Sequence, residues 1–215
     1  MRYSVLVQRA LAPPPPSTKP MKQPEPTSFD ALMSQGMAAS LANDGVQAIE
    51  WFQRASAAEP GAGLPQFLLG AEFAALGDMA QAEAAFANAT RLSPGFPMAR
   101  YQLGLLQFSS GRAAIALLTW QPLLSLPDTD PLPHFVNGFA ALAQDHFDEA
   151  LHHYQQGLTL NTTNEALSGD IEKVIAGIKA LHPDASAADN ERSSSGDTAD
   201  NHVLLANYQQ QGRAH

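Results

Sequence analysis

Three histidines near residue 150 are the side chains that would most readily bind a metal ion, namely His146, His152 and His153. On a helix, positions 146 and 153 are about two turns apart, so their rings could share one face. No H-E-x-x-H pattern accompanies them, although such a pattern is what places two histidines and a general base on a zinc ion. We therefore interpret them as solvated helix histidines and expect neither a metal site nor a cofactor.

Other chemistry is poorly supported by the residue types. The chain has no cysteine, which excludes disulfides, thiolate nucleophiles and thiolate zinc sites. It also has no G-x-S-x-G nucleophile motif and no glycine-rich phosphate loop. Because no catalytic constellation is present, we predict that the protein is not an enzyme.

The charge of the chain limits its partners. The formal net charge is -9, and residues 29–166 contain 4 Arg or Lys against 13 Asp or Glu. An acidic surface repels phosphates, which argues against nucleic acid and against an anionic membrane surface. No stretch approaches the roughly 20 apolar residues of a membrane span. The first apolar run is interrupted by Gln8 and Arg9 and is then followed by four prolines, so we predict a cytoplasmic protein, with export as the less favoured alternative.

The elements that must position any binding site are a set of paired amphipathic runs. The clearest pair spans residues 66–94, where two runs of about a dozen residues flank a turn at Gly77-Asp78. Three residue types recur at steps of 34 positions from this pair. They are the glycines Gly36, Gly70, Gly104 and Gly138, the alanines Ala48, Ala82, Ala116 and Ala150, and the aromatic residues Phe52, Phe86, Trp120 and Tyr154.

This register has a simple physical meaning. A glycine lets two helices meet backbone to backbone, the alanine lets the second helix lie flat on the first, and the aromatic side chain fills the wedge between hairpins. The pattern resembles that of the tetratricopeptide repeat (TPR) family over about residues 28–181. The resemblance implies an all-α fold, an α-solenoid of about four helix–turn–helix repeats plus a C-terminal capping helix, and it implies a protein that works by binding other polypeptides.

The resemblance divides the chain into five parts. We expect a proline-rich disordered leader at 1–27, four TPR repeats within 28–162, a capping helix at 163–182, and a disordered tail at 183–215 with a short apolar segment at 202–208. The repeats are expected at about 28–60, 63–96, 97–130 and 131–162. Pro122 should bend or end the second helix of the third repeat, because proline removes a backbone hydrogen bond. A capping box, Thr162-x-x-Glu165, predicts the start of the capping helix.

The family resemblance also implies where a partner would bind. In TPR arrays the first helix of each hairpin lines the concave surface through its second, fifth, ninth and twelfth repeat positions. The Lys, Arg and Asn residues with which some relatives hold a carboxylate are missing here. Instead these positions are mostly apolar, and we predict that the partner-binding residues are Met33, Met37, Phe67, Met98, Tyr101, Leu105, Phe108, Phe135, Phe139 and Leu142.

Two interpretations of this apolar strip remain open. Apolar residues at helical spacing can be core residues that pack between helices. An exposed strip, in contrast, would receive an amphipathic helix or an extended apolar peptide. The second interpretation predicts a non-enzymatic adaptor or chaperone. The alternative function is a structural subunit whose groove is filled by its own C-terminal segment or by a second copy, so self-association is compatible with the sequence.

Overall fold

The computed structural model describes residues 27–182, and within this range the chain forms nine α-helices, one short 3-10 helix and no strand. The predicted all-α solenoid is confirmed. The leader up to residue 26, the tail from residue 183 and its apolar segment at 202–208 lie outside the described residues. The helices are α1 (Phe29–Leu41), α2 (Gly45–Ala58), α3 (Gly63–Ala75), α4 (Met79–Leu92), α5 (Pro97–Ser109), α6 (Ala113–Trp120), the 3-10 helix η1 (Gln121–Ser125), α7 (Pro131–Leu142), α8 (Phe147–Leu160) and α9 (Glu165–Leu181).

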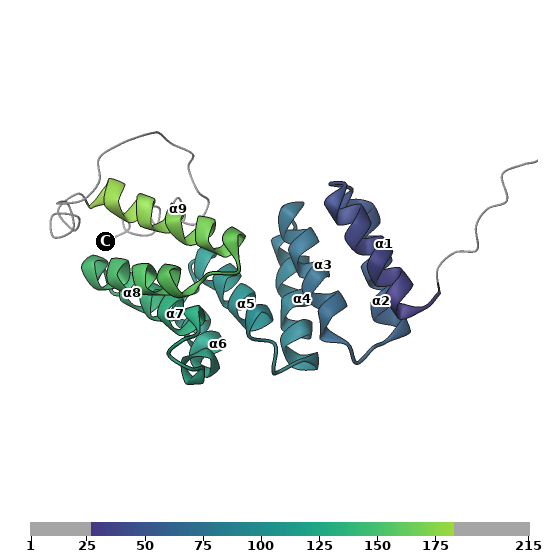
Figure 1. Cartoon of the computed structure of the whole chain (residues 1–215), viewed down its shortest axis with the longest axis horizontal. Helices are drawn as coiled ribbons and strands as arrows, with labels where there is room; N and C mark the ends of the chain where they lie inside the picture. Colours follow the sequence, from purple (N-terminus) through teal and green to yellow (C-terminus); the bar gives the residue numbers. More distant parts are fainter. Residues whose placement is uncertain (1–26, 183–215) are drawn as a thin grey trace, which may run out of the picture.

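The helices follow a strict 34-residue register. The first helices of the four hairpins begin at Phe29, Gly63, Pro97 and Pro131. The second helices begin at Gly45, Met79, Ala113 and Phe147. The hairpins follow one another along the molecule in chain order, with α1 at one end and α8 and α9 at the other (Figure 1). Helix α9 begins 34 residues after α7, so it has the register of a further first helix.

The turn inside each hairpin contains one residue in the left-handed region, again at steps of 34. These residues are Asn43, Gly77, Gly111 and Asp145, with φ between 58° and 81°. Glycine adopts this conformation without strain, and Asn and Asp adopt it more readily than other residues. In the first two hairpins the next residue, Asp44 or Asp78, accepts a hydrogen bond from a backbone N–H of the following helix and caps it.

Each recurring glycine lies directly beneath the recurring aromatic ring of its own hairpin. A Cβ added to Gly70 would lie 2.6 Å from the ring of Phe86, and one added to Gly104 would collide with the indole of Trp120. Gly36 and Gly138 have the same relationship to Phe52 and Tyr154. Because the ring occupies the volume that a side chain would need, the two helices of each hairpin are held at a close approach.

Pro122 interrupts the third hairpin as predicted. Helix α6 has only eight residues and ends at Trp120, and the chain continues as η1. Proline has no N–H to continue the helical hydrogen bonds. The interruption leaves the aromatic position intact, since Nε1–H of Trp120 donates a buried hydrogen bond of 2.9 Å to the carbonyl of Tyr101.

The start of α9 differs from the prediction. The N-cap is Asn164, whose side chain accepts a hydrogen bond from the backbone N–H of Leu167 at 3.1 Å. The predicted capping box, Thr162-x-x-Glu165, is therefore wrong by two residues. Asparagine is as strong an N-cap as threonine or stronger, and Asn164 lies next to the 34-residue register at Glu165.

The buried core is divided into three clusters along the molecule. The N-terminal cluster contains Leu32, Met33, Ala39, Ala48, Phe52, Ala55, Leu69 and Ala85. The middle cluster is small and contains only Ala82, Phe86 and Leu103 as buried residues. The C-terminal cluster joins the third and fourth hairpins to α9 and contains Tyr101, Ala116, Trp120, Leu123, Leu132, Phe135, Val136, Phe139, Ala141, Leu142, Ala150, Tyr154, Leu167, Ile171, Val174 and Ile178.

Candidate functional site

The predicted partner-binding residues all lie on the first helices α1, α3, α5 and α7. We call the surface formed by the second, fifth, ninth, twelfth and thirteenth positions of these hairpins the first-helix face. Its character changes along the molecule. In α7 every large side chain at these positions is buried, whereas in α1 and α3 several are exposed.

Helix α9 is part of the buried core in the C-terminal half of the molecule. Its apolar stripe shares one buried cluster with the aromatic residues of α5 and α7. The charge of Asp170 on α9 also acts on the hydroxyl of Tyr101 on α5, so α9 reaches across to the third hairpin. At its other end α9 is held by His182, whose ring stacks on Phe147 of α8 with 3.7 Å between ring centroids. The chain thus covers part of this face with its own helix.

An aromatic cluster centred on Trp120 fills the space beneath α9. The indole lies 5.9 Å from the ring of Tyr101, 5.9 Å from that of Phe108 and 5.2 Å from that of Phe139, measured between centroids. Phe139 also meets Tyr154 edge to face at 5.3 Å. Aromatic pairs at these separations stabilise a core beyond the area that they bury. These side chains are therefore structural in the free protein.

The ten predicted residues are consequently divided between core and surface. Five are buried, namely Met33, Tyr101, Phe135, Phe139 and Leu142. Four are partly buried, namely Phe67, Met98, Leu105 and Phe108, and only Met37 is exposed. The five buried side chains belong to the core of the free protein, and the binding role of all ten stays a prediction.

Apolar surface remains on the N-terminal half of the first-helix face. Met37 is 51% exposed, Leu41 85% and Leu64 46%, and Ala71 and Ala75 of α3 are also exposed. Leu41 is absent from the predicted set, although it lies four residues after Met37 and therefore on the same side of α1. We call Met37, Leu41, Leu64, Ala71 and Ala75 the α1–α3 surface.

Two buried tyrosine hydroxyls in the C-terminal cluster have no hydrogen-bond partner among residues 27–182. They belong to Tyr101 and Tyr154. Burial raises the pKa of Tyr101, with a smaller contribution from the negative charge of Asp170, and burial also raises the pKa of Tyr154. Both phenols are therefore neutral at any physiological pH. They are not suited to serve as general bases.

Two histidines, His146 and His153, lie near one carboxylate of α8. Glu149 lies 3.5 Å from Nδ1 of His146 and 3.9 Å from Nε2 of His153. The ring of His153 is 6.5 Å from that of His134 and 5.9 Å from that of His152. Burial lowers the pKa of His153 and the two neighbouring histidines lower it further, whereas Glu149 and a hydrogen bond with Gln156 oppose them. Within residues 27–182 no group of three or more such side chains is arranged to hold a metal ion.

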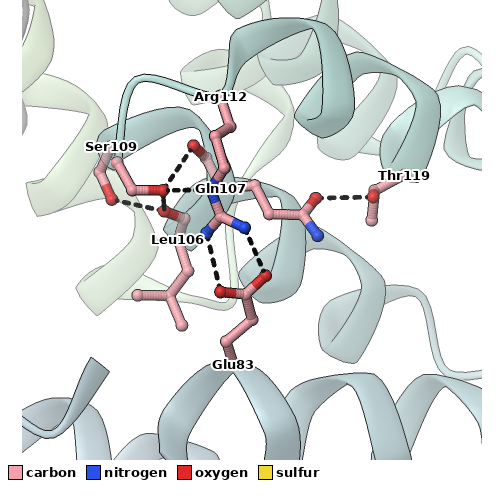
Figure 2. Close-up of polar contacts among 7 residues, drawn as sticks. Glu83, Leu106, Gln107, Ser109, Arg112 and Thr119 are labelled. Carbon is pink, nitrogen blue, oxygen red and sulfur yellow. Dashed lines mark hydrogen bonds and ion pairs between the residues drawn. The ribbon is translucent and has the colours of Figure 1, made fainter. Parts of the chain in front are cut away.

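An ion pair joins the second hairpin to the third. Arg112 lies in the turn between α5 and α6, where the first two hairpins have a capping aspartate, and it donates two hydrogen bonds to Glu83 of α4 (Figure 2). Beside it Gln107, the buried polar side chain of α5, accepts a 2.6 Å hydrogen bond from Thr119. The Arg112 guanidinium holds the pKa of Glu83 below its ordinary value. This site connects repeats and offers no free ligand-binding group.

Comparisons with known proteins agree with this architecture. A family model described as tetratricopeptide repeat matches residues 67–121, which extend from α3 to the end of α6. No curated protein matches the sequence. None of the helices within residues 27–182 is both long and apolar enough to cross a membrane.

Several solved structures are similar to this chain. A crystal structure of MamA is 20% identical, with a TM-score of 0.54, over 63% of this chain and 80% of that one. MamA 41-end from Desulfovibrio magneticus RS-1 is 14% identical, with a TM-score of 0.57, over 87% of this chain and 97% of that one. The ArsTM double mutant of MamA RS-1 is 14% identical, with a TM-score of 0.57, over 85% of this chain and 96% of that one. At these identities the similarity shows the fold alone.

Proposed function

Because the chain is a tetratricopeptide-repeat protein, we propose that it is a non-enzymatic adaptor or chaperone that binds an apolar or amphipathic segment of another protein on the α1–α3 surface. The TPR fold supports a protein-interaction role in general. The observation that carries the specific site is the contrast between hairpins. Met37 and Leu64 are about half exposed, whereas their counterparts in α7, Phe139 and Leu132, are buried.

The energetics favour an apolar ligand at this surface. Burying apolar area contributes about 25 cal/mol per Å², and Leu41 alone is 85% exposed. Met37 and Leu41 are four residues apart on α1, so they present one continuous stripe to a ligand helix. Methionine also adapts its shape to different partners. The one charged residue among the first-helix positions of α1 is Asp30, which would favour a ligand with a basic flank.

A comparative pull-down from native lysate tests this proposal, with the captured proteins identified by mass spectrometry. The baits are the full chain, a Met37→Gln/Leu41→Gln/Leu64→Gln variant, and a Leu124→Gln control, since Leu124 is 47% exposed but lies in η1. Circular dichroism melts first establish that all three baits are equally folded. We expect at least one protein to be captured by the wild type and the control and lost by the triple variant. The proposal is wrong if the triple variant captures the same set as the wild type.

The alternative function is a structural subunit whose first-helix face is filled by its own C-terminal segment or by a second copy. The position of α9 supports this alternative, because it is a case in which the chain covers part of that face with its own helix. Fluorescence of an apolar dye separates the two functions. An adaptor with a free α1–α3 surface binds the dye as the intact monomer, and the triple variant binds less. A filled surface binds the dye only after residues 183–215 are removed or after the oligomer dissociates.

A further inference from the structure

Helix α6 exposes apolar side chains on its outer side, away from the first-helix face. Ile115 is 47% exposed and Leu118 is 72% exposed. Ala114 of α6 and Pro122, which follows α6 in η1, are also exposed. On a helix, positions 114 and 115 are both neighbours of position 118, and Pro122 extends this group into η1. We call these four residues the α6 outer patch.

The other three hairpins have a mostly polar surface at the same place. The counterparts of Ile115 at steps of 34 are Gln47, Gln81 and Glu149. Those of Leu118 are Glu50, Ala84 and His152, and those of Pro122 are Arg54, Asn88 and Gln156. The repeat fold therefore does not require apolar residues here. The patch is specific to the third hairpin, and contiguous exposed apolar residues of this kind mark interaction sites.

The patch also lies in an uncharged part of an acidic protein. From residue 113 to residue 126 the chain contains no Asp, Glu, Lys or Arg, although its net charge is -9. An occupant of this patch should therefore be short, apolar and without negative charge. The chain contains two such segments outside the described residues, at 3–7 and at 202–208. The second follows α9, which is three helices from α6, whereas the first precedes α1, which is five helices from α6.

We propose that residues 202–208 of this chain dock on the α6 outer patch. The segment reads His202-Val203-Leu204-Leu205-Ala206-Asn207-Tyr208. Residues 183–200 contain five Asp or Glu, whereas residues 201–215 contain none and have one arginine, Arg213. The apolar residues of the tail thus coincide with its non-acidic part, which suits an acidic body with an uncharged apolar patch.

The tail is long enough to reach the patch. Neighbouring helix axes are about 8–10 Å apart, so three helix-to-helix steps from α9 to α6 span at most about 30 Å. If the patch also lies one length of α9 further along the helix axes, this adds about 25 Å at right angles to those steps. The distance from the end of α9 to the patch is then about 40 Å. The 19 residues from 183 to 201 span up to about 60 Å when extended. The linker therefore does not prevent the contact.

The size of the patch favours the chain's own segment over a second copy. A stable dimer interface buries about 800 Å² per partner and involves about 20–30 residues on each side, which is far more than four residues provide. A tethered segment, in contrast, has an effective concentration that can reach the millimolar range. At a micromolar protein concentration, a weak contact on a small patch therefore forms within one chain more readily than between two chains.

Amide hydrogen exchange of the full chain tests this proposal. The patch variant is Ile115→Gln/Leu118→Glu, which gives the third hairpin the side chains of the first, and the segment variant is Leu204→Ser/Leu205→Ser. Met37→Gln on the α1–α3 surface is the matched control. We expect amides 203–208 to exchange at least tenfold more slowly in the wild type and the control than in the patch and segment variants. Folding of the patch variant is checked from the unchanged protection of α7 and α8.

Three outcomes would overturn the proposal. The first is free exchange of residues 203–208 in the wild type. The second is protection that survives the patch variant, which would place the segment elsewhere, and the third is protection that rises with protein concentration, which would indicate a second copy. Because the chain has no cysteine, crosslinking gives an independent measurement: Leu118→Cys/Leu205→Cys should oxidise to a monomeric disulfide at least tenfold faster than Met37→Cys/Leu205→Cys.

Discussion

Arg112 donates two hydrogen bonds to Glu83, from Nη1 to Oε1 at 2.9 Å and from Nη2 to Oε2 at 2.7 Å, and so connects the turn of the third hairpin to the second helix of the second (Figure 2). The fork of a guanidinium matches the two oxygens of a carboxylate. At this position the first two hairpins have an aspartate that caps their second helix. The third hairpin thus has an inter-repeat bond in place of a local cap.

Replacing Arg112 with alanine should lower the free energy of unfolding by about 0.5–1 kcal/mol, because both side chains are partly exposed and such pairs are weak. A double-mutant cycle with Glu83→Gln measures the coupling by urea denaturation. The folded-state pKa of Glu83 is lowered from 4.5, first by the hydrogen bond from Arg112. Its contribution is therefore fully present above pH 4.5 and is lost as the pH falls through the lowered value. A coupling that does not decrease on acidification would contradict this assignment.

Gly104→Ala should destabilise the protein by about 1–3 kcal/mol, because the new methyl group collides with the indole of Trp120 and overpacks the hairpin. Gly169→Ala is the matched control. Gly169 lies inside α9 with nothing near its missing Cβ, so alanine there should stabilise the protein by about 0.5–1 kcal/mol. Thermal unfolding of both variants measures the effects, and equal shifts of the two melting temperatures would contradict the glycine–aromatic contact.

Acidification should weaken the packing of α8 against α7 through His153. Its folded-state pKa lies below 6.5, mainly because of burial, so the unfolded chain binds a proton first as the pH falls. The stability is therefore highest above pH 6.5 and decreases below it. The groups that face His153 are Glu149 and Gln156, which oppose the effect, and His152 and His134, which add to it.

The matched variant for this effect is His153→Gln, which removes the titrating group. The difference in unfolding free energy between wild type and variant should be constant above pH 6.5. Between about pH 6.5 and 5 the wild type should lose stability relative to the variant. Urea titrations at several pH values measure this difference. A difference that stays constant across that range would show that His153 does not couple folding to protons.

Tyr154→Phe should leave the stability unchanged or raise it, although most substitutions of a fully buried residue are destabilising. The buried hydroxyl of Tyr154 has no hydrogen-bond partner in the part of the chain that the structure describes, and leaving such a group unpaired costs about 1–3 kcal/mol. Trp120→Phe, in contrast, should lower the stability, because it removes a hydrogen-bonded N–H and part of a packed ring. If Tyr154→Phe lost more than about 1 kcal/mol in a urea titration, the hydroxyl would have a partner in solution.

The helices could be predicted from the sequence because their signals are local and repeated. Glycine, alanine and an aromatic residue return every 34 positions, and every hairpin helix begins in the same register. Pro122 likewise acts through its own missing N–H, and its effect was predicted correctly. At the start of α9, both Thr162 and Asn164 are residue types that can cap a helix. Spacing in the sequence alone does not show that Asn164 is the one that does so.

The burial of the first-helix face could not be predicted in the same way. Phe139 and Met37 occupy the same repeat position, yet Phe139 is buried and Met37 is exposed. The ring of Phe139 packs on Phe108 and Trp120 of the preceding hairpin and on Tyr154 of α8, whereas within the described residues no hairpin precedes Met37. Periodicity identifies the side of a helix on which a residue lies, but it does not say which other helix covers that side.

The division of the core into three clusters has a consequence for cooperativity. Only Ala82, Phe86 and Leu103 form the buried middle cluster, and the Arg112–Glu83 pair is a bond of modest strength beside it. In repeat proteins the coupling between neighbours decides whether the chain unfolds as one unit. The buried cluster that α4 and α5 share is the smallest of the three, so we expect hairpins α1–α4 to open separately from α5–α9. If they do, the half that exposes the α1–α3 surface would rearrange around a ligand without unfolding α5–α9.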